Sequence, residues 1–224
     1  VRLLRAAGLV VLALVAGLPL LTFAQPSALT VLSRDGRKPL PLTTINNLDY
    51  VAVDDINTAF GTTSREDRLA GGLTISIRGR SIVLTENQNV VSVSGRLASL
   101  PAPPIRRDNR WFVPVDFMPR ALALVLDTRI DLRRATRLLV VGDLRVPRVV
   151  ARVDAGTTDV AVTFEVTPNT DARVVSQQGR LVVQFEADAL ELALPSLPPQ
   201  TFLLGLSPGE APNTVILTTG PRYA

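Results

Sequence analysis

The chain has 224 residues, a formal net charge of +4, and neither histidine nor cysteine. Without these two residue types it cannot build a Ser-His-Asp or Cys-His catalytic group, a disulfide, or a zinc or copper site with nitrogen or sulfur ligands. Nucleic-acid binding is also excluded, because the charge is small and the arginines are scattered among acids instead of forming a basic stripe.

The first 24 residues have the features of a secretory signal peptide. Arg2 and Arg5 precede an apolar run from Ala6 to Leu21, and the small residues of Thr22-Phe23-Ala24 end it. The run approaches the roughly 20 residues that span a bilayer, but its glycines, its proline and its small-residue exit favour cleavage. We therefore expect a signal peptide at residues 1–24, a periplasmic or cell-envelope location, and no membrane span after cleavage. Retention of the segment as an anchor is the alternative.

A repeat with an offset of 62 residues organises the next part of the chain. It relates Val51-Ala-Val-Asp54 to Val113-Pro-Val-Asp116, and it also matches the apolar and small residues that follow: Ile56 with Met118, Ala59 with Ala121 and Phe60 with Leu122. In each copy an alternating strand pattern stops at an aspartate suited to cap a helix, and a second alternating run follows. The sequence therefore predicts two β-α-β units that pack against each other.

Turn signals surround these units. Asp35-Gly36, Gly79-Arg80 and Gly95-Arg96 each separate two extended runs, which predicts β-hairpins. The segment from Leu100 to Ile105 contains three prolines, which lack the amide that a central strand needs. We therefore interpret it as the extended connection between the two copies.

The duplication occurs together with the run Asn109-Arg-Trp-Phe-Val-Pro114. In this order the two features resemble the bacterial stalk domain, a family named after the non-catalytic N-terminal domain of copper amine oxidases. The resemblance covers Leu29 to Asp143 and implies a stalk domain at residues 28–143. The family name does not imply copper in this chain. Ala52 departs from the family pattern, which has a proline at that place in the first copy.

Beyond residues 142–147 the pattern changes to strands without helical periodicity. Val160 to Val166 and Leu181 to Phe185 alternate apolar and polar residues, which predicts a small antiparallel β-sandwich at residues 146–224. These two strands, with the preceding Asp159 and Gly179-Arg180, resemble the AMIN domain, a β-sandwich that targets proteins to the cell envelope. The expected fold class is therefore α+β, mainly β, with a duplicated β-α-β stalk domain followed by an AMIN-like sandwich.

Carboxylates remain as candidate catalytic groups. Asp54 and Asp116 occupy equivalent positions, as the two aspartates of an acid protease do, but each stands between a strand and a helix, where capping is the simpler interpretation. Asp154-Ala-Gly156 is closer to an acid-protease loop in sequence, yet it occurs once and lies where a hairpin turn is expected. We therefore predict no catalytic, cofactor-binding or metal-binding residue in this chain.

Four residues are candidates for binding a polymer. Trp111 is the sole tryptophan and its ring suits stacking on a sugar, although its place at the start of an apolar strand favours burial. Arg173, Arg180 and Gln184 suit an anionic or amide-rich polymer. The alternative interpretation of these three is an ordinary polar sheet face.

The order of the domains resembles the N-terminal region of a bacterial N-acetylmuramoyl-L-alanine amidase, a zinc hydrolase whose catalytic domain follows the AMIN module. The resemblance implies a non-catalytic region that targets the cell envelope and binds peptidoglycan, with zinc held only in a downstream domain. We interpret the first residue, Val1, and the abrupt end at Ala224 as signs of a fragment. The alternatives are an AMIN-containing secretin or pilus assembly protein and a stand-alone wall-binding module.

Overall fold

The computed structural model describes residues 28–156, 159–197 and 202–221, so the predicted signal peptide lies outside the described residues. Within them the chain is mainly β-strand, which confirms the expected fold class at that level. The helical segments are α1 (Val53–Phe60), a π-helical turn η1 (Met118–Leu122) that continues into α2 (Ala123–Leu126), and a 3-10 turn η2 (Arg134–Thr136). Across the described part of the chain, every helix is too short or too polar to cross a membrane.

A four-stranded sheet lies at the centre of the N-terminal part. Its order is β10 (Ile105–Arg107), β11 (Arg110–Pro114), β4 (Leu48–Ala52) and β3 (Thr43–Ile45). The inner strands β11 and β4 are antiparallel, with Val113 and Val51 as Cα partners. The outer strands complete two hairpins, β3–β4 and β10–β11, whose bounds differ by the same offset of 62 residues that relates the sequence copies.

The turns of these two hairpins are also alike. Asn46 and Asn47 form the first turn with φ of 50° and 62°, and Asp108 and Asn109 form the second with φ of 50° and 61°. Two consecutive residues of positive φ match the twist of a two-residue hairpin. Asn and Asp tolerate this conformation better than other residues that carry a Cβ. The two hairpins therefore have strands of equal length and turns of similar φ and similar residue type.

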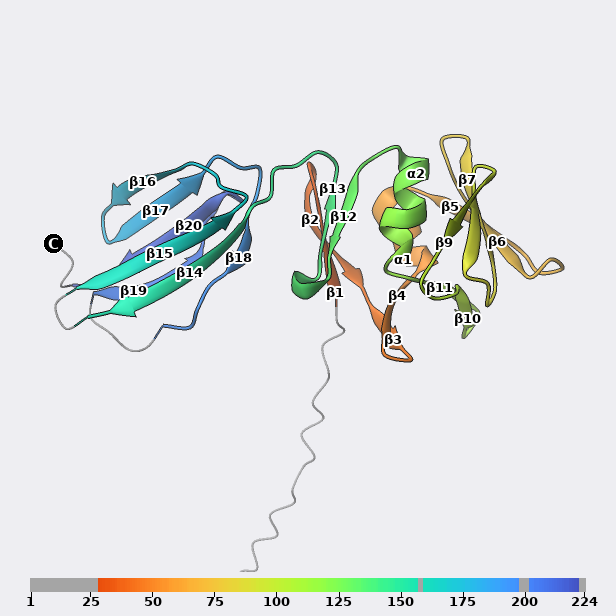
Figure 1. The fold of residues 1–224 in the computed structure, drawn as a ribbon, viewed down its shortest axis with the longest axis horizontal. Coiled ribbons are helices and arrows are strands. Elements are labelled where there is room, and N and C mark those ends of the chain that lie inside the picture. The colour runs from red at the N-terminus through yellow and green to blue at the C-terminus, as the bar shows by residue number, and fades with distance from the viewer. Residues whose placement is uncertain (1–27, 157–158, 198–201, 222–224) are drawn as a thin grey trace, which may run out of the picture.

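Two further sheets flank the central one (Figure 1). The first has the order β12 (Ile130–Arg133), β13 (Leu138–Val141), β1 (Ala28–Ser33) and β2 (Gly36–Pro41), with β1 and β13 parallel. The second has the order β5 (Thr63–Asp67), β6 (Gly72–Ile77), β7 (Arg80–Thr85), β8 (Val90–Val93) and β9 (Arg96–Ser99). The predicted hairpin turns are confirmed. Gly79 and Gly95 lie between paired strands, Gly36 begins β2 just after the turn from β1, and all three have positive φ.

The predicted aspartate caps are wrong. α1 begins one residue before Asp54, its N-cap is Ala52, and no side chain caps it. Asp54 therefore lies inside the first turn, where its negative charge is attracted to the positive end of the helix dipole. Asp116 precedes η1 and accepts a hydrogen bond from Arg134 instead of capping the helix. Pro119 lies in the first turn of η1, where its missing amide removes no helical bond.

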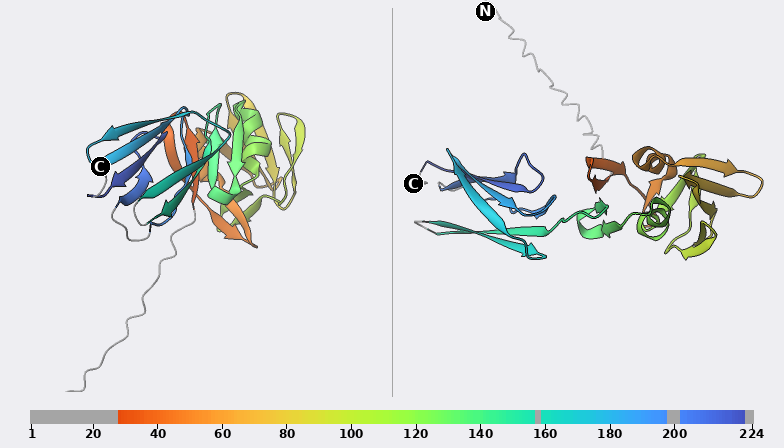
Figure 2. Two further views of the ribbon diagram at one scale, coloured as in Figure 1. Left: turned by 60° about the vertical axis from the view of Figure 1, so that its left-hand side comes forward. Right: turned by 90° about the horizontal axis from the view of Figure 1, so that it is seen from above.

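One hydrophobic core unites the three N-terminal sheets and their helices. Residues that the offset matches occupy it together, since Ile56 of α1 and Met118 of η1 are both fully buried. The centre of the core also contains Phe117 and Leu122, both fully buried. The helices lie between the two flanking sheets (Figures 1 and 2). Burial of this apolar area is the main stabilising term, at about 25 cal/mol per Å² removed from water.

The C-terminal part is a sandwich of two sheets, seen as separate layers in Figure 2. The three-stranded sheet has the order β15 (Val160–Thr167), β14 (Arg148–Ala155) and β18 (Glu191–Ala193). The four-stranded sheet has the order β16 (Ala172–Gln177), β17 (Arg180–Phe185), β20 (Thr214–Thr219) and β19 (Leu203–Pro208). The core between them contains Val149, Val183, Phe185 and Leu217.

The expectation of a wholly antiparallel sandwich is wrong for one pair of strands, because β18 lies parallel to β14. Between these two strands the chain passes through β15, β16 and β17, the last two of which belong to the opposite sheet. Parallel neighbours need such a long crossover, whereas a short turn produces an antiparallel pair. Local alternation along each strand does not contain this information.

The two parts of the molecule contact each other through a small apolar cluster and several polar contacts. Leu32, Leu138 and Val140 of the first flanking sheet pack with Val146 and Ala189. All five side chains are buried. This sheet lies beside the sandwich in Figure 1. The contact therefore extends the N-terminal packing into the C-terminal part.

Two arginines of the N-terminal part complete the interface. Arg37 Nη2 donates to the Leu190 carbonyl at 2.9 Å, and Arg133 Nη1 donates to Glu191 Oε2 at 2.5 Å and to the Val146 carbonyl at 2.9 Å. Burial acts to lower the pKa of Arg133, but its hydrogen bonds with Glu191 and Asp131 outweigh burial, and the pKa is raised. The Arg133 guanidinium therefore stays charged, and its ion pair with Glu191 links the two parts of the molecule.

Candidate functional site

Three of the four candidate polymer-binding residues, Arg173, Arg180 and Gln184, share one surface of the sandwich. Arg173 and Gln184 are Cα partners across β16 and β17, as are Gln177 and Arg180. Alternate residues of a strand lie on the same face, and the intervening Leu181, Val183 and Phe185 pack into the core. The candidates therefore lie on the solvent side of the four-stranded sheet. We call this side the outer face: Arg173, Val175, Gln177, Arg180, Val182, Gln184, Thr214, Ile216 and Thr218.

The middle of the outer face is apolar and its ends are polar. Val175 is the Cα partner of Val182, which is in turn the partner of Ile216, so the three form a row across the sheet. Val175 is 43% exposed. Arg173 lies on one side of this row and Arg180 on the other. The surface therefore offers an apolar strip between two cations.

A polar hollow of about 400 Å³ lies at the Arg173 end of the outer face. Its lining combines two arginines, two carboxylates and two amides with the ends of the strands: Arg145, Asp171, Ala172, Arg173, Gln184, Phe185, Glu186, Ala187 and Asn213. This volume is within the usual range of small-ligand sites. We call it the polar hollow.

Hydrogen bonds within the hollow orient its donors. Arg173 donates from Nε at 3.0 Å and from Nη2 at 2.6 Å to the same oxygen, Gln184 Oε1. The Arg145 amide donates to Asp188 Oδ2 at 2.7 Å, which holds its segment against the sandwich. Among the described residues, neither Arg145 nor Arg173 forms an ion pair. Two guanidinium groups are thus available to an anionic or carbonyl-bearing ligand.

The Arg180 end of the outer face carries a smaller hollow of about 180 Å³. It is lined by Gln177, Arg180, Val182, Glu210, Ala211, Thr214 and Ile216. Arg180 donates from Nε to Gln177 Oε1 at 2.6 Å, which repeats the arginine-to-amide pairing at the other end. The outer face therefore presents two similar polar groups separated by an apolar strip, an arrangement suited to an extended ligand.

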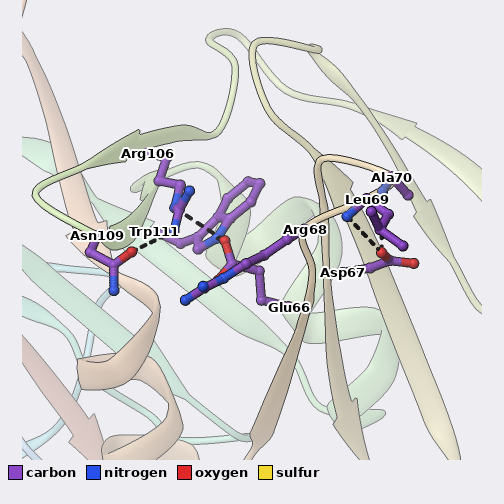
Figure 3. Close-up of polar contacts among 8 residues, drawn as sticks. All are labelled: Glu66, Asp67, Arg68, Leu69, Ala70, Arg106, Asn109 and Trp111. Carbon is purple, nitrogen blue, oxygen red and sulfur yellow. Dashed lines mark hydrogen bonds and ion pairs between the residues drawn. The ribbon is translucent and has the colours of Figure 1, made fainter.

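Trp111 lies elsewhere, in the N-terminal core. It is 6% exposed, and its Nε1 donates to Glu66 Oε1 at 3.2 Å (Figure 3). Arg106 Nε lies 3.1 Å from the same oxygen as an ion pair, and Arg106 Nη2 donates to Asn109 Oδ1 at 2.5 Å. The hydrogen bond from Trp111 lowers the pKa of Glu66; burial opposes this effect, and Arg68 and Arg106 add to it. The buried indole has little ring surface for stacking on a sugar.

Asp54 and Asp116, which occupy equivalent positions in the two sequence copies, have separate hydrogen-bond partners. Asp54 Oδ2 accepts from Arg110 Nε at 3.3 Å, whereas Asp116 accepts from Arg134. An acid-protease pair instead shares one proton between two adjacent carboxylates. Asp154 belongs to β14, opposite Ala161. In the parts of the chain that the structure describes, no group of three or more acidic residues is placed to hold a metal ion.

Reasoning from the sequence missed Arg145 and Asn213 as parts of the candidate site. Arg145 belongs to the segment between the two parts of the molecule, and Asn213 lies just before β20. Neither is in the strand that carries Arg173. In the sequence, Arg145 is marked only by its place in the segment between two predicted strands. The packing of that segment against the sandwich brings Arg145 to the polar hollow.

Residues 37–135 match the family described as the copper amine oxidase N-terminal domain. This match supports the predicted stalk domain at residues 28–143. The outer face lies after the matched residues, in the C-terminal sandwich. The comparison with curated proteins found no match, and neither did the comparison with solved structures.

Proposed function

We propose that this chain is a non-catalytic region of a cell-envelope protein, and that its outer face binds peptidoglycan. The observation that carries the proposal is the pairing of Arg173 with Gln184 beside Arg145, on an open sheet face whose middle is apolar. The residues of this face offer binding groups without a nucleophile-base pair or a metal-ligand cluster.

The chemistry of peptidoglycan suits these groups. Its stem peptides carry carboxylates and amides, and its glycan carries ring faces and acetamido groups. Guanidinium groups bind carboxylates through two parallel hydrogen bonds, and glutamine and asparagine side chains both donate to and accept from amides. The row of Val175, Val182 and Ile216 offers apolar contact for a methyl group or a ring face between the polar ends.

The N-terminal part serves in this proposal as an internally duplicated stalk. The shared offset of the β3–β4 and β10–β11 hairpins, and the equal conformations of their turns, support the duplication. We assign the sandwich to the AMIN type from the sequence pattern of β15 and β17. Because the chain contains no histidine or cysteine, we assign the amidase reaction, with its zinc ion, to a domain outside this chain.

Binding to purified sacculi tests the proposal. The chain from Gln25 to Ala224 is expected to sediment with sacculi at low salt, and Arg173→Ala combined with Gln184→Ala is expected to weaken binding about tenfold, the loss of roughly 1.4 kcal/mol of polar contacts. Arg152→Ala is the matched control, because it removes one arginine from the opposite sheet. No sedimentation at low salt, or equal loss in the control, overturns the proposal.

A further inference from the structure

One side of the C-terminal sandwich is open. A groove of about 530 Å³ runs between β15 and β16, the edge strands of the two sheets. Val160, Val162, Phe164 and Val166 of β15 form one wall, and the lining contains no charged side chain. Val174 of β16 also lines the groove, yet it is 62% exposed. The Val174 side chain is therefore mostly open to solvent.

In the described part of the chain, the edge of β15 that faces away from β14 is the strand edge with the least protection against pairing with another strand. It has eight residues and neither proline nor a basic residue, and its one charge is Glu165. The other edges carry the features that discourage pairing with another strand. β2 and β19 contain prolines, β5 contains three charged residues, β16 carries Arg173, and β3, β9, β10, β12 and β18 have three or four residues.

A strand is the ligand that fits this edge best. The amides and carbonyls of β15 that face away from β14 have no partner strand among the described residues, and a further strand satisfies them by continuing the ladder. A lipid chain or a sugar ring fills the groove without satisfying the backbone. The wall has apolar residues at every second position, so the added strand needs the same alternation.

We propose that β15 pairs with β15 of a second copy of this chain, antiparallel about a twofold axis at Thr163. In this register Val162 faces Phe164 of the second copy and Val160 faces its Val166, all on the groove side. Glu165 faces Ala161 of the second copy, so no like charges meet. In this register β15 is complementary to a second copy of itself. The sheet formed by the two copies then continues past β15 and covers Val174.

A single cysteine tests the axis directly, because the chain contains none. The register places the two copies of Thr163 opposite each other, and opposed residues of antiparallel strands have Cα atoms about 4.5–5.5 Å apart, within the range for a disulfide. Thr163→Cys is therefore expected to form a covalent dimer under mild oxidation. Ala161→Cys is the control, because it faces Glu165 of the second copy. Equal cross-linking of both variants overturns the register.

Sedimentation equilibrium from about 1 to 100 µM tests the association itself. The chain is expected to show twice its monomer mass at the upper end. Val162→Lys places a charge on the groove side of the edge and is expected to weaken the dimer at least tenfold, whereas Ser207→Lys on β19 leaves it unchanged. Circular dichroism checks that both variants fold. A chain that stays monomeric throughout, or a dimer that survives Val162→Lys, overturns the proposal.

Discussion

Val51 and Val113 are Cα partners on the two central strands of the N-terminal part, and both are fully buried. They are also the residues that the offset of 62 matches in the sequence. The two sequence copies therefore meet at the same position of each copy. Because β4 and β11 run antiparallel, the pair lies at the centre of an arrangement in which hairpin β3–β4 faces hairpin β10–β11.

Val51 and Val113 are expected to contribute equally to the free energy of unfolding. Val51→Ala and Val113→Ala each remove two methyl groups from a fully buried site, and each is expected to lower the free energy of unfolding by about 2 kcal/mol. Urea unfolding followed by Trp111 fluorescence measures this effect. Val83→Ala is the control, because that side chain is 43% exposed and its expected effect is below about 0.5 kcal/mol. A large difference between the two central variants contradicts their equivalence.

The ion pair between Arg133 and Glu191 is expected to couple the two parts of the molecule. Glu191 is 9% exposed, and Glu191→Ala leaves the partly buried Arg133 with only the more exposed Asp131 as an ionic partner. The variant is expected to cost about 2 kcal/mol, less than the loss of a fully buried pair. Calorimetry is expected to show one unfolding transition in the unchanged chain and two in the variant. Glu165→Ala breaks an exposed pair with Arg152 and is expected to cost below about 0.5 kcal/mol. One unchanged transition in Glu191→Ala contradicts the coupling.

Acid is expected to weaken the N-terminal part through Glu66. Its pKa is lowered in the folded chain, so its contribution to stability is present above the ordinary glutamate pKa of about 4.3 and is lost as pH falls through the folded value. Glu66→Gln is therefore expected to be less stable than the unchanged chain at neutral pH and to lose less stability between about pH 5 and 3. Urea midpoints from Trp111 fluorescence measure this. Parallel pH profiles of the two chains contradict the assignment.

Arg145 is expected to contribute to sacculus binding although it lies outside the strands of the outer face. Arg145→Ala removes one of the two guanidinium groups of the polar hollow and is expected to weaken binding about threefold to tenfold at low salt. Binding is also expected to fall as salt rises through physiological strength, where exposed charges are screened over about 8 Å. Arg148→Ala, an exposed arginine that begins β14, is the control. Equal binding by Arg145→Ala removes this residue from the site.

The purified chain is expected to release no stem peptides from peptidoglycan, with or without added zinc. A zinc hydrolase holds its metal through nitrogen, sulfur and carboxylate ligands and keeps one position for the activated water. This chain has no histidine or cysteine for that purpose. Chromatography of soluble peptides after prolonged incubation measures the outcome, with an active amidase as the positive control. Zinc-dependent release above background contradicts the prediction.

The sequence by itself determined the local elements. Glycine turns marked the hairpins at Gly36, Gly79 and Gly95, and alternation marked β15 and β17, because turn conformation and strand faces depend on neighbouring residues. The offset of 62 also carries structural information, since it relates both central hairpins. For the candidate site, the sequence named Arg173, Arg180 and Gln184 as residues suited to a polymer, and the register of β16 and β17 places all three on one face.

Only the tertiary structure decided where distant segments meet. It placed Trp111 in the core beside Glu66, brought Arg145 to Arg173, and made β18 a parallel neighbour of β14. In the structure α1 begins at Val53, one residue before Asp54, and the Asp54 carboxylate accepts a hydrogen bond from Arg110 instead of capping the helix. These contacts join residues separated by 28 to 56 positions in the sequence, counting the hydrogen bond of Asp54 with Arg110 as the widest. Such contacts depend on which surfaces are buried together, and the pattern along a single strand or helix does not specify that choice.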